Sequence, residues 1–192
     1  MGRKKRLWHP QYFDHVVMRG NNRQVIFAEQ QDFAEFFRAL HYTYDKYPFE
    51  LLAYCLMNNH YHLLILSKTP LSKTMMLLNR RYSDYYKKKY RYSGHLYENR
   101  YYSDMVLSAQ GILEVSRYIH QNPIRTKTPL VNELEHYPYS SFQYYVAPKK
   151  APVYLNPFAL VQYFPLESER TLENYITYCS IIEKTVVHEM PL

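Results

Sequence analysis

Glycine is scarce in this chain, with only four copies among 192 residues. They stand apart, at Gly2, Gly20, Gly94 and Gly111. A P-loop or a dinucleotide-binding turn needs clustered glycines, because backbone N–H groups must come close to the phosphates. The sequence therefore excludes both of these turns, and we expect no nucleotide cofactor.

Cysteines and long apolar runs are also few. The two cysteines, Cys55 and Cys179, cannot build the disulfide framework of a small secreted scaffold. No apolar run is long enough to span a bilayer, and the basic start of the chain lacks the apolar stretch of a signal peptide. We therefore expect a cytoplasmic protein with no membrane-spanning segment.

Positive charge and tyrosine are abundant instead. Lys and Arg number 24 against 17 for Asp and Glu, so the formal net charge is +7. This excess favours a polyanionic partner, either nucleic acid or an acidic membrane surface. The 23 tyrosines can fill half-buried positions or stack on unpaired bases. Composition alone leaves the partner open.

The apolar pattern predicts an α+β fold, an antiparallel sheet with helices packed on it. The predicted strands are 12–19, 49–57, 60–66 and 96–106, and the predicted helices are 30–46, 71–90 and 108–122. Beyond Pro129 the prolines predict an irregular extension, which closes with a helix that buries Tyr175 and Cys179. We expect a catalytic domain over 1–130 and a C-terminal extension over 131–192 packed on the same domain.

Two histidines two residues apart, His60 and His62, fall on the third predicted strand. Alternate side chains of a strand point to the same face, so both imidazoles project together and could bind one metal ion. A pair of buried, hydrogen-bonded histidines would give the same pattern. The pair therefore needs a second motif to decide its role.

That second motif lies near the end of the third predicted helix. Tyr118 and Asn122 are four residues apart and share one helical face. Tyrosine can act as a covalent nucleophile, although its ordinary pKa near 10 demands a reactive electrophile. A core tyrosine and a helix-ending asparagine before Pro123 would explain the same residues.

Together these motifs resemble those of a known family. The segment Asn58-Asn59-His60-Tyr61-His62-Leu63-Leu64-Ile65 resembles the HUH motif, histidine-hydrophobic-histidine, of single-tyrosine transposases, especially the REP-associated tyrosine transposases. The segment 117–123 resembles the helix that carries their nucleophile. Matches of the same kind occur, in the same order, at 20–23, 93–96 and 137–141. The resemblance covers about 12–145, but Tyr97-Glu98-Asn99-Arg100 departs from the Gln-Gly-Arg expected there.

The resemblance implies a ferredoxin-like sheet of the HUH endonuclease type and assigns the site residues. His60 and His62 would bind a divalent ion, Mg²⁺ or Mn²⁺, and Asn122 falls where REP-associated members place a third ligand. Insertion-sequence relatives carry glutamine there. Tyr118 would attack a DNA phosphate, which gives a 5′-phosphotyrosyl intermediate that a 3′-hydroxyl can reverse. Other histidines could replace a ligand but lack the paired-strand geometry, namely His9, His15, His95 and His120.

The resemblance implies DNA as the partner and no membrane. We expect a single strand or a hairpin, because attack needs an exposed and bendable strand. Basic residues expected to hold its backbone are Arg19, Arg23, Arg80, Arg81 and Arg100, together with the stretch Arg3, Lys4, Lys5 and Arg6. A monomer and a homodimer are both compatible with the sequence.

Two other functions remain open. A replication-initiator or conjugative nickase shares the HUH chemistry, although relaxases place the tyrosine before the histidines and here it follows them. A domesticated DNA-binding protein would keep the fold without cleaving DNA.

Overall fold

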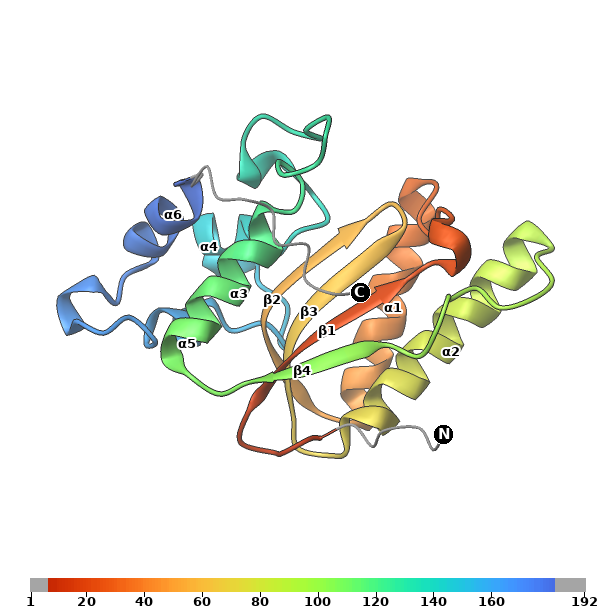
Figure 1. Cartoon of the computed structure of the whole chain (residues 1–192), viewed down its shortest axis with the longest axis horizontal. Coiled ribbons are helices and arrows are strands. Elements are labelled where there is room, and N and C mark those ends of the chain that lie inside the picture. The colour runs from red at the N-terminus through yellow and green to blue at the C-terminus, as the bar shows by residue number, and fades with distance from the viewer. Residues whose placement is uncertain (1–6, 182–192) are drawn as a thin grey trace.

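The computed structural model describes residues 7–181, so the predicted DNA-binding stretch from Arg3 to Arg6 lies outside the described part. A four-stranded sheet forms the centre of the molecule (Figure 1). Its strands are β1 (Phe13–Arg19), β2 (Phe49–Met57), β3 (His60–Ser67) and β4 (Tyr102–Val106). Their spatial order is β2-β3-β1-β4, and every neighbouring pair is antiparallel.

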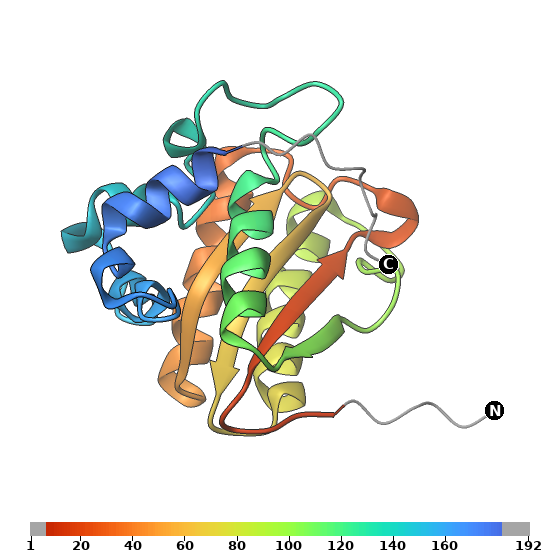
Figure 2. The same cartoon turned by 60° about the vertical axis from the view of Figure 1, so that its left-hand side comes forward.

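Helices cover both faces of this sheet. The long helices are α1 (Gln30–Lys46), α2 (Leu71–Tyr90) and α3 (Ala109–Gln121). Helices α1 and α2 lie side by side on one face, and Figure 2 shows α3 lying across the other. From β1 to β4 the long elements follow the order strand-helix-strand-strand-helix-strand. This is the ferredoxin-like arrangement, and it confirms the predicted α+β class.

Successive side chains of β1 point to opposite faces of the sheet, so they enter two different cores. Val16 and Met18 join the apolar core beneath α1 and α2, whereas Phe13 joins the core beneath α3. Because successive side chains of a strand alternate, His15 lies on the α3 face with Phe13. The α3 face is therefore where β1 can contribute a polar group.

Local signals fix the bounds of α3. Ser108 precedes the helix, and its hydroxyl accepts a hydrogen bond from the Gly111 N–H at 3.0 Å, which satisfies one of the helix's unpaired donors. Asn122 caps the other end, directly before Pro123. The predicted start near Ser108 and end near Asn122 are confirmed.

The predicted strand over 96–106 is too long. Only Tyr102–Val106 pairs as β4, and before it a single bridge joins Tyr97 to Gly20. The three residues Glu98, Asn99 and Arg100 are exposed, so no burial holds them against β1. The segment instead lines a cavity of about 640 Å³ with residues of α2.

The C-terminal extension is irregular and partly helical, as predicted. It contains α4 (Gln143–Val146), α5 (Pro157–Val161) and α6 (Leu172–Ser180), of which α6 buries Tyr175 and Cys179. The extension also pairs with the outer edge of β2, through bridges from Ser140 to Cys55 and from Leu155 to Leu51. Among the described residues, no helix combines the length and the apolar character needed to cross a membrane. The division of the chain at residue 130 stays a prediction.

Candidate active site

The histidine pair lies on a central strand, β3, directly after the Asn58–Asn59 turn. His60 is opposite Arg19 of β1, and His62 is opposite Val17, so the pair sits between β1 and β2. The two imidazole rings have centroids 5.0 Å apart. Tyr61 points to the opposite face, where its hydroxyl donates to Asn79 Oδ1 at 2.6 Å. The prediction that His60 and His62 point to the same face of the strand is confirmed.

Helix α3 places the second motif against this pair. The Tyr118 ring meets the His62 ring edge to face, with centroids 5.5 Å apart. The Asn122 amide donates from Nδ2 to the Tyr118 carbonyl at 2.9 Å, and its side chain also acts as a hydrogen-bond partner of His60. The four residues of the two motifs thus meet within one chain.

Burial keeps both histidines of the pair neutral. It lowers the pKa of His60 to about 4, with a smaller contribution from the Arg19 charge, while the Asn122 contact acts in the opposite direction. Burial also lowers the pKa of His62 well below its ordinary value, and His60, His15 and Arg19 add to this effect. A neutral imidazole keeps a lone pair on one ring nitrogen, which is the form that binds a metal ion.

The ring nitrogens of His62 have unequal surroundings. Nδ1 lies 3.0 Å from Nε2 of His15, which makes a buried hydrogen bond between the two rings. Nε2 is also buried and has no hydrogen-bond partner among the described residues. Most buried polar atoms have a partner, so this nitrogen calls for an explanation.

The sequence gives His15 no second histidine on its own strand, yet the structure brings it into the site. The signal available in the sequence was its place on the same face of β1 as Phe13 and Val17. Only the register of β1 against β3, with His15 opposite Leu64, reveals that it reaches His62.

The other three histidines that could have replaced a ligand, His9, His95 and His120, lie away from the pair. His120 is fully buried on the extension side of α3, where its Nδ1 pairs with the Tyr175 hydroxyl at 2.8 Å and its Nε2 with Ser141 Oγ at 2.7 Å. His95 lines the cavity beside α2, and His9 is exposed before β1. Both nitrogens of His120 are engaged in packing the extension, which leaves none to replace a metal ligand.

These buried histidines predict a loss of stability in acid. Burial lowers the pKa of His15 and of His60 to about 4 and that of His120 to about 3, and the pKa of His62 shifts in the same direction. Because the folded pKa lies below the unfolded value, the unfolded chain takes up protons first as pH falls below about 6.5. His15, His60 and His120 then each cost about 2 kcal/mol at pH 5, and His62 adds a cost of the same sign. Asp14 opposes this by about 1 kcal/mol, since burial and Asp104 raise its pKa to about 6.

We therefore expect the free energy of unfolding to fall by at least about 5 kcal/mol between pH 7.5 and pH 5, which urea titrations at the two pH values would measure. In a His120→Gln variant the drop should be smaller by about 2 kcal/mol, because glutamine does not titrate. Equal stability at both pH values would contradict the buried neutral state of these rings.

The five described arginines proposed to hold DNA do not form one patch. Arg19 lies beside the histidine pair, since its charge acts on the pKa of both rings. Arg80 and Arg81 are exposed on α2, on the opposite side of the sheet, where Arg81 stacks on the Tyr42 ring at 3.7 Å. Arg23 is exposed after β1, and Arg100 lines the cavity. Their contacts with DNA stay a prediction.

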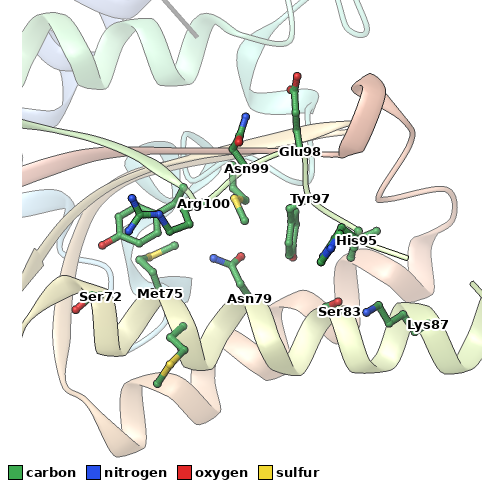
Figure 3. A pocket seen from close by; sticks show the side chains of 14 residues that line it. Ser72, Met75, Asn79, Ser83, Lys87, His95, Tyr97, Glu98, Asn99 and Arg100 are labelled. Carbon is green, nitrogen blue, oxygen red and sulfur yellow. The ribbon is translucent and has the colours of Figure 1, made fainter. Parts of the chain in front are cut away.

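The cavity lies between α2 and the segment before β4 (Figure 3). Figure 3 shows Asn79 on α2 and Tyr97 on the facing segment pointing into the same space. The Tyr97 hydroxyl is buried without a hydrogen-bond partner among the described residues. Asn79 Oδ1 already accepts from Tyr61, so its amide N–H groups remain as donors. The cavity therefore combines apolar walls with polar groups, as ligand pockets do.

A separate group of ligand-type residues is exposed in the extension, comprising Glu133, Glu135 and His136, with ligand atoms within 4.8 Å of one another. Exposed acidic groups of this kind are common without an ion. We assign no metal site there.

Comparisons with known proteins bear on the family and on the fold. The family model for IS200-like transposases matches residues 7–122, which is more than half of the chain. A Haemophilus influenzae protein named as a REP-associated tyrosine transposase is 26% identical over 146 residues, covering 68% of this chain and 78% of the relative. A solved REP-associated tyrosine transposase, bound to a REP hairpin, superposes with a TM-score of 0.64 at 16% identity, covering 80% of this chain and 90% of that one. This last match confirms the fold.

Proposed function

This chain belongs to the IS200-like transposase family, and from that premise we propose that it cuts and rejoins single-stranded DNA with Tyr118 as its nucleophile. One observation carries the proposal. The Tyr118 ring lies edge to face against His62, in the same chain and beside Asn122, so nucleophile and ligand candidates converge without a second subunit. Packing in the core alone would not explain why the Tyr118 ring lies against two neutral histidines.

The residues of the site fit a divalent metal ion. His62 Nε2 is a buried nitrogen without a partner among residues 7–181; the His60 ring lies next to the His62 ring, and Asn122 lies next to His60. Mg²⁺ or Mn²⁺ would be held by these three residues; the imidazoles suit Mn²⁺ better, whereas cellular abundance favours Mg²⁺. When bound, the ion would act as a Lewis acid that draws charge from the scissile phosphate.

Tyr118 supplies the covalent step. Its hydroxyl loses its proton and its oxygen bonds to phosphorus, while the bond from phosphorus to the 3′ oxygen breaks and that oxygen takes up a proton. The products are an enzyme joined through tyrosine to the 5′-phosphate of one DNA fragment and a free 3′-hydroxyl on the other fragment. One phosphate ester replaces another, so a 3′-hydroxyl can reverse the step without ATP, in keeping with the lack of a nucleotide-binding turn.

We further propose that the substrate contains unpaired nucleotides. The solved relative was bound to a REP hairpin, which makes hairpin DNA the first substrate to test. Arg19 lies beside the histidine pair, where it can hold a backbone phosphate. The cavity beside α2 has the size and mixed lining for an unpaired base, with Tyr97 and Asn79 inside it and Arg100 among its lining residues.

The experiment that tests the function uses an end-labelled DNA hairpin with single-stranded flanks and added Mg²⁺ or Mn²⁺. We expect cleavage and a protein–DNA adduct that survives denaturant, with little of either on a duplex of the same composition. Tight binding without any cleavage or adduct would instead support the domesticated DNA-binding protein. Preferential nicking of a duplex origin would support an initiator-type nickase.

A further inference from the structure

The histidine on β1 contacts the histidine pair from a neighbouring strand. His15 is fully buried, its ring is nearly parallel to the His62 ring at an interplanar angle of 18°, and Nε2 lies 3.0 Å from His62 Nδ1. The Tyr118 ring also meets His15 edge to face at 6.0 Å. His15 therefore touches both the second residue of the pair and the nucleophile candidate.

The hydrogen bond between the rings decides where His62 carries its proton. A neutral imidazole has one N–H and one lone pair, so one ring must donate and the other must accept. If His62 held its proton on Nε2, that donor would be buried without a partner in the part of the chain that the structure describes. If it holds the proton on Nδ1, this N–H donates to His15, and the Nε2 lone pair is left for a metal ion.

We propose that His15 is a positioning residue for His62, which accepts the Nδ1 proton and so presents the Nε2 lone pair to the metal ion. The inference deepens the proposed function and rests on its metal site. His15 then carries its own proton on Nδ1. Partners of this kind fix the tautomer and ring orientation of a metal-binding histidine.

The geometry separates this role from direct metal binding by His15. Its Nε2 is already directed at His62 Nδ1, so that nitrogen cannot also face an ion held by His62 Nε2. The β1–β3 register supports the arrangement, since His15 is two residues from Val17, which lies opposite His62. Both rings are therefore anchored on adjacent strands of the central sheet.

The first test uses the metal-free, wild-type protein. Nitrogen NMR of labelled histidine distinguishes protonated from unprotonated ring nitrogens, and single substitutions of the other histidines assign the His62 signals. We expect His62 to hold its proton on Nδ1 and to leave Nε2 unprotonated. A proton on Nε2 would overturn the proposal, and this readout requires neither metal binding nor DNA cleavage.

The second test measures Mn²⁺ affinity by electron paramagnetic resonance. His15→Phe keeps a ring but removes the acceptor, and we expect affinity to fall by about 10- to 100-fold. His15→Gln offers an amide oxygen as acceptor and should restore most of the affinity. His41→Phe, at an exposed histidine on α1, is the matched control and should bind as the wild type does.

The outcomes separate the two proposals. Unchanged affinity in His15→Phe, or equal losses in the Phe and Gln variants, would overturn the positioning role. If wild-type protein binds no Mn²⁺, the metal part of the proposed function fails, while the NMR result still decides where the His62 proton lies.

Discussion

Replacement of Tyr118 by phenylalanine should abolish DNA cleavage and leave DNA binding close to the wild-type level. The substitution keeps the ring, and with it the edge-to-face contacts with His62 and His15, but removes the oxygen proposed to attack the phosphate. Without that oxygen no phosphotyrosyl bond can form, so we expect both adduct and cleaved product to fall to background. Gel analysis of a labelled hairpin after denaturation measures both.

The matched control is Tyr102→Phe, because Tyr102 is exposed on β4 next to the same region of the sheet. It should form the adduct normally. Competing tyrosines on α2 are engaged on the other face, where Tyr82 donates to the Ile26 carbonyl, Tyr85 to Asp32 and Tyr86 to the Val25 carbonyl. Peptide mapping should place the nucleotide on Tyr118. An adduct on any other tyrosine would refute the assignment.

Removal of one of the two histidines proposed as metal ligands should have an effect of similar size. Either histidine of the pair, His60 or His62, could be replaced by alanine for this test. The structure favours His60→Ala as the test, because His60 is half-buried whereas His62 is fully buried and bonded to His15. Loss of the Lewis acid should slow cleavage at least about a thousandfold, since metal stabilisation is worth several kcal/mol.

The measurement is single-turnover cleavage with Mg²⁺ or Mn²⁺ restored after chelation, alongside urea unfolding to verify the fold. An Arg38→Ala variant, at an exposed position on α1, provides a control for nonspecific loss. Full wild-type cleavage in EDTA would end the metal mechanism, and wild-type rates in His60→Ala would remove His60 from the ligand set.

The sequence predicted the elements of this fold well because its apolar periodicity is strong. Strand alternation assigned β1 and β3 correctly, and the bounds of α1 and α2 agree with the helical spacing. The strand before α3 was extended too far, because Leu96 and Tyr97 continue a strand-like pattern into the exposed residues Glu98 to Arg100. Pattern alone cannot tell a paired edge from a segment that leaves the sheet.

In the site, too, the sequence predicts some features and misses others. His60 and His62 are two residues apart, so strand geometry alone predicts their shared face. The approach of Tyr118, 56 residues beyond His62, came only from the resemblance to a family. His15 was missed as a partner because its contact depends on the register between two strands, and no spacing within a single segment encodes that register.

The pairing of the C-terminal extension with β2 predicts what a premature stop codon in the gene would do to the protein. A stop codon after Pro129 would leave both motifs in the reading frame but remove Ser141, whose N–H donates to the Tyr54 carbonyl, and Tyr137, whose hydroxyl donates to the Leu56 carbonyl. His120 would lose both of its partners. The apolar edge of β2 would then be open to pairing with other copies of the chain. A shortened reading frame with every motif residue intact is therefore expected to yield an aggregating product, so motif survival in a genome is poor evidence of an active mobile gene.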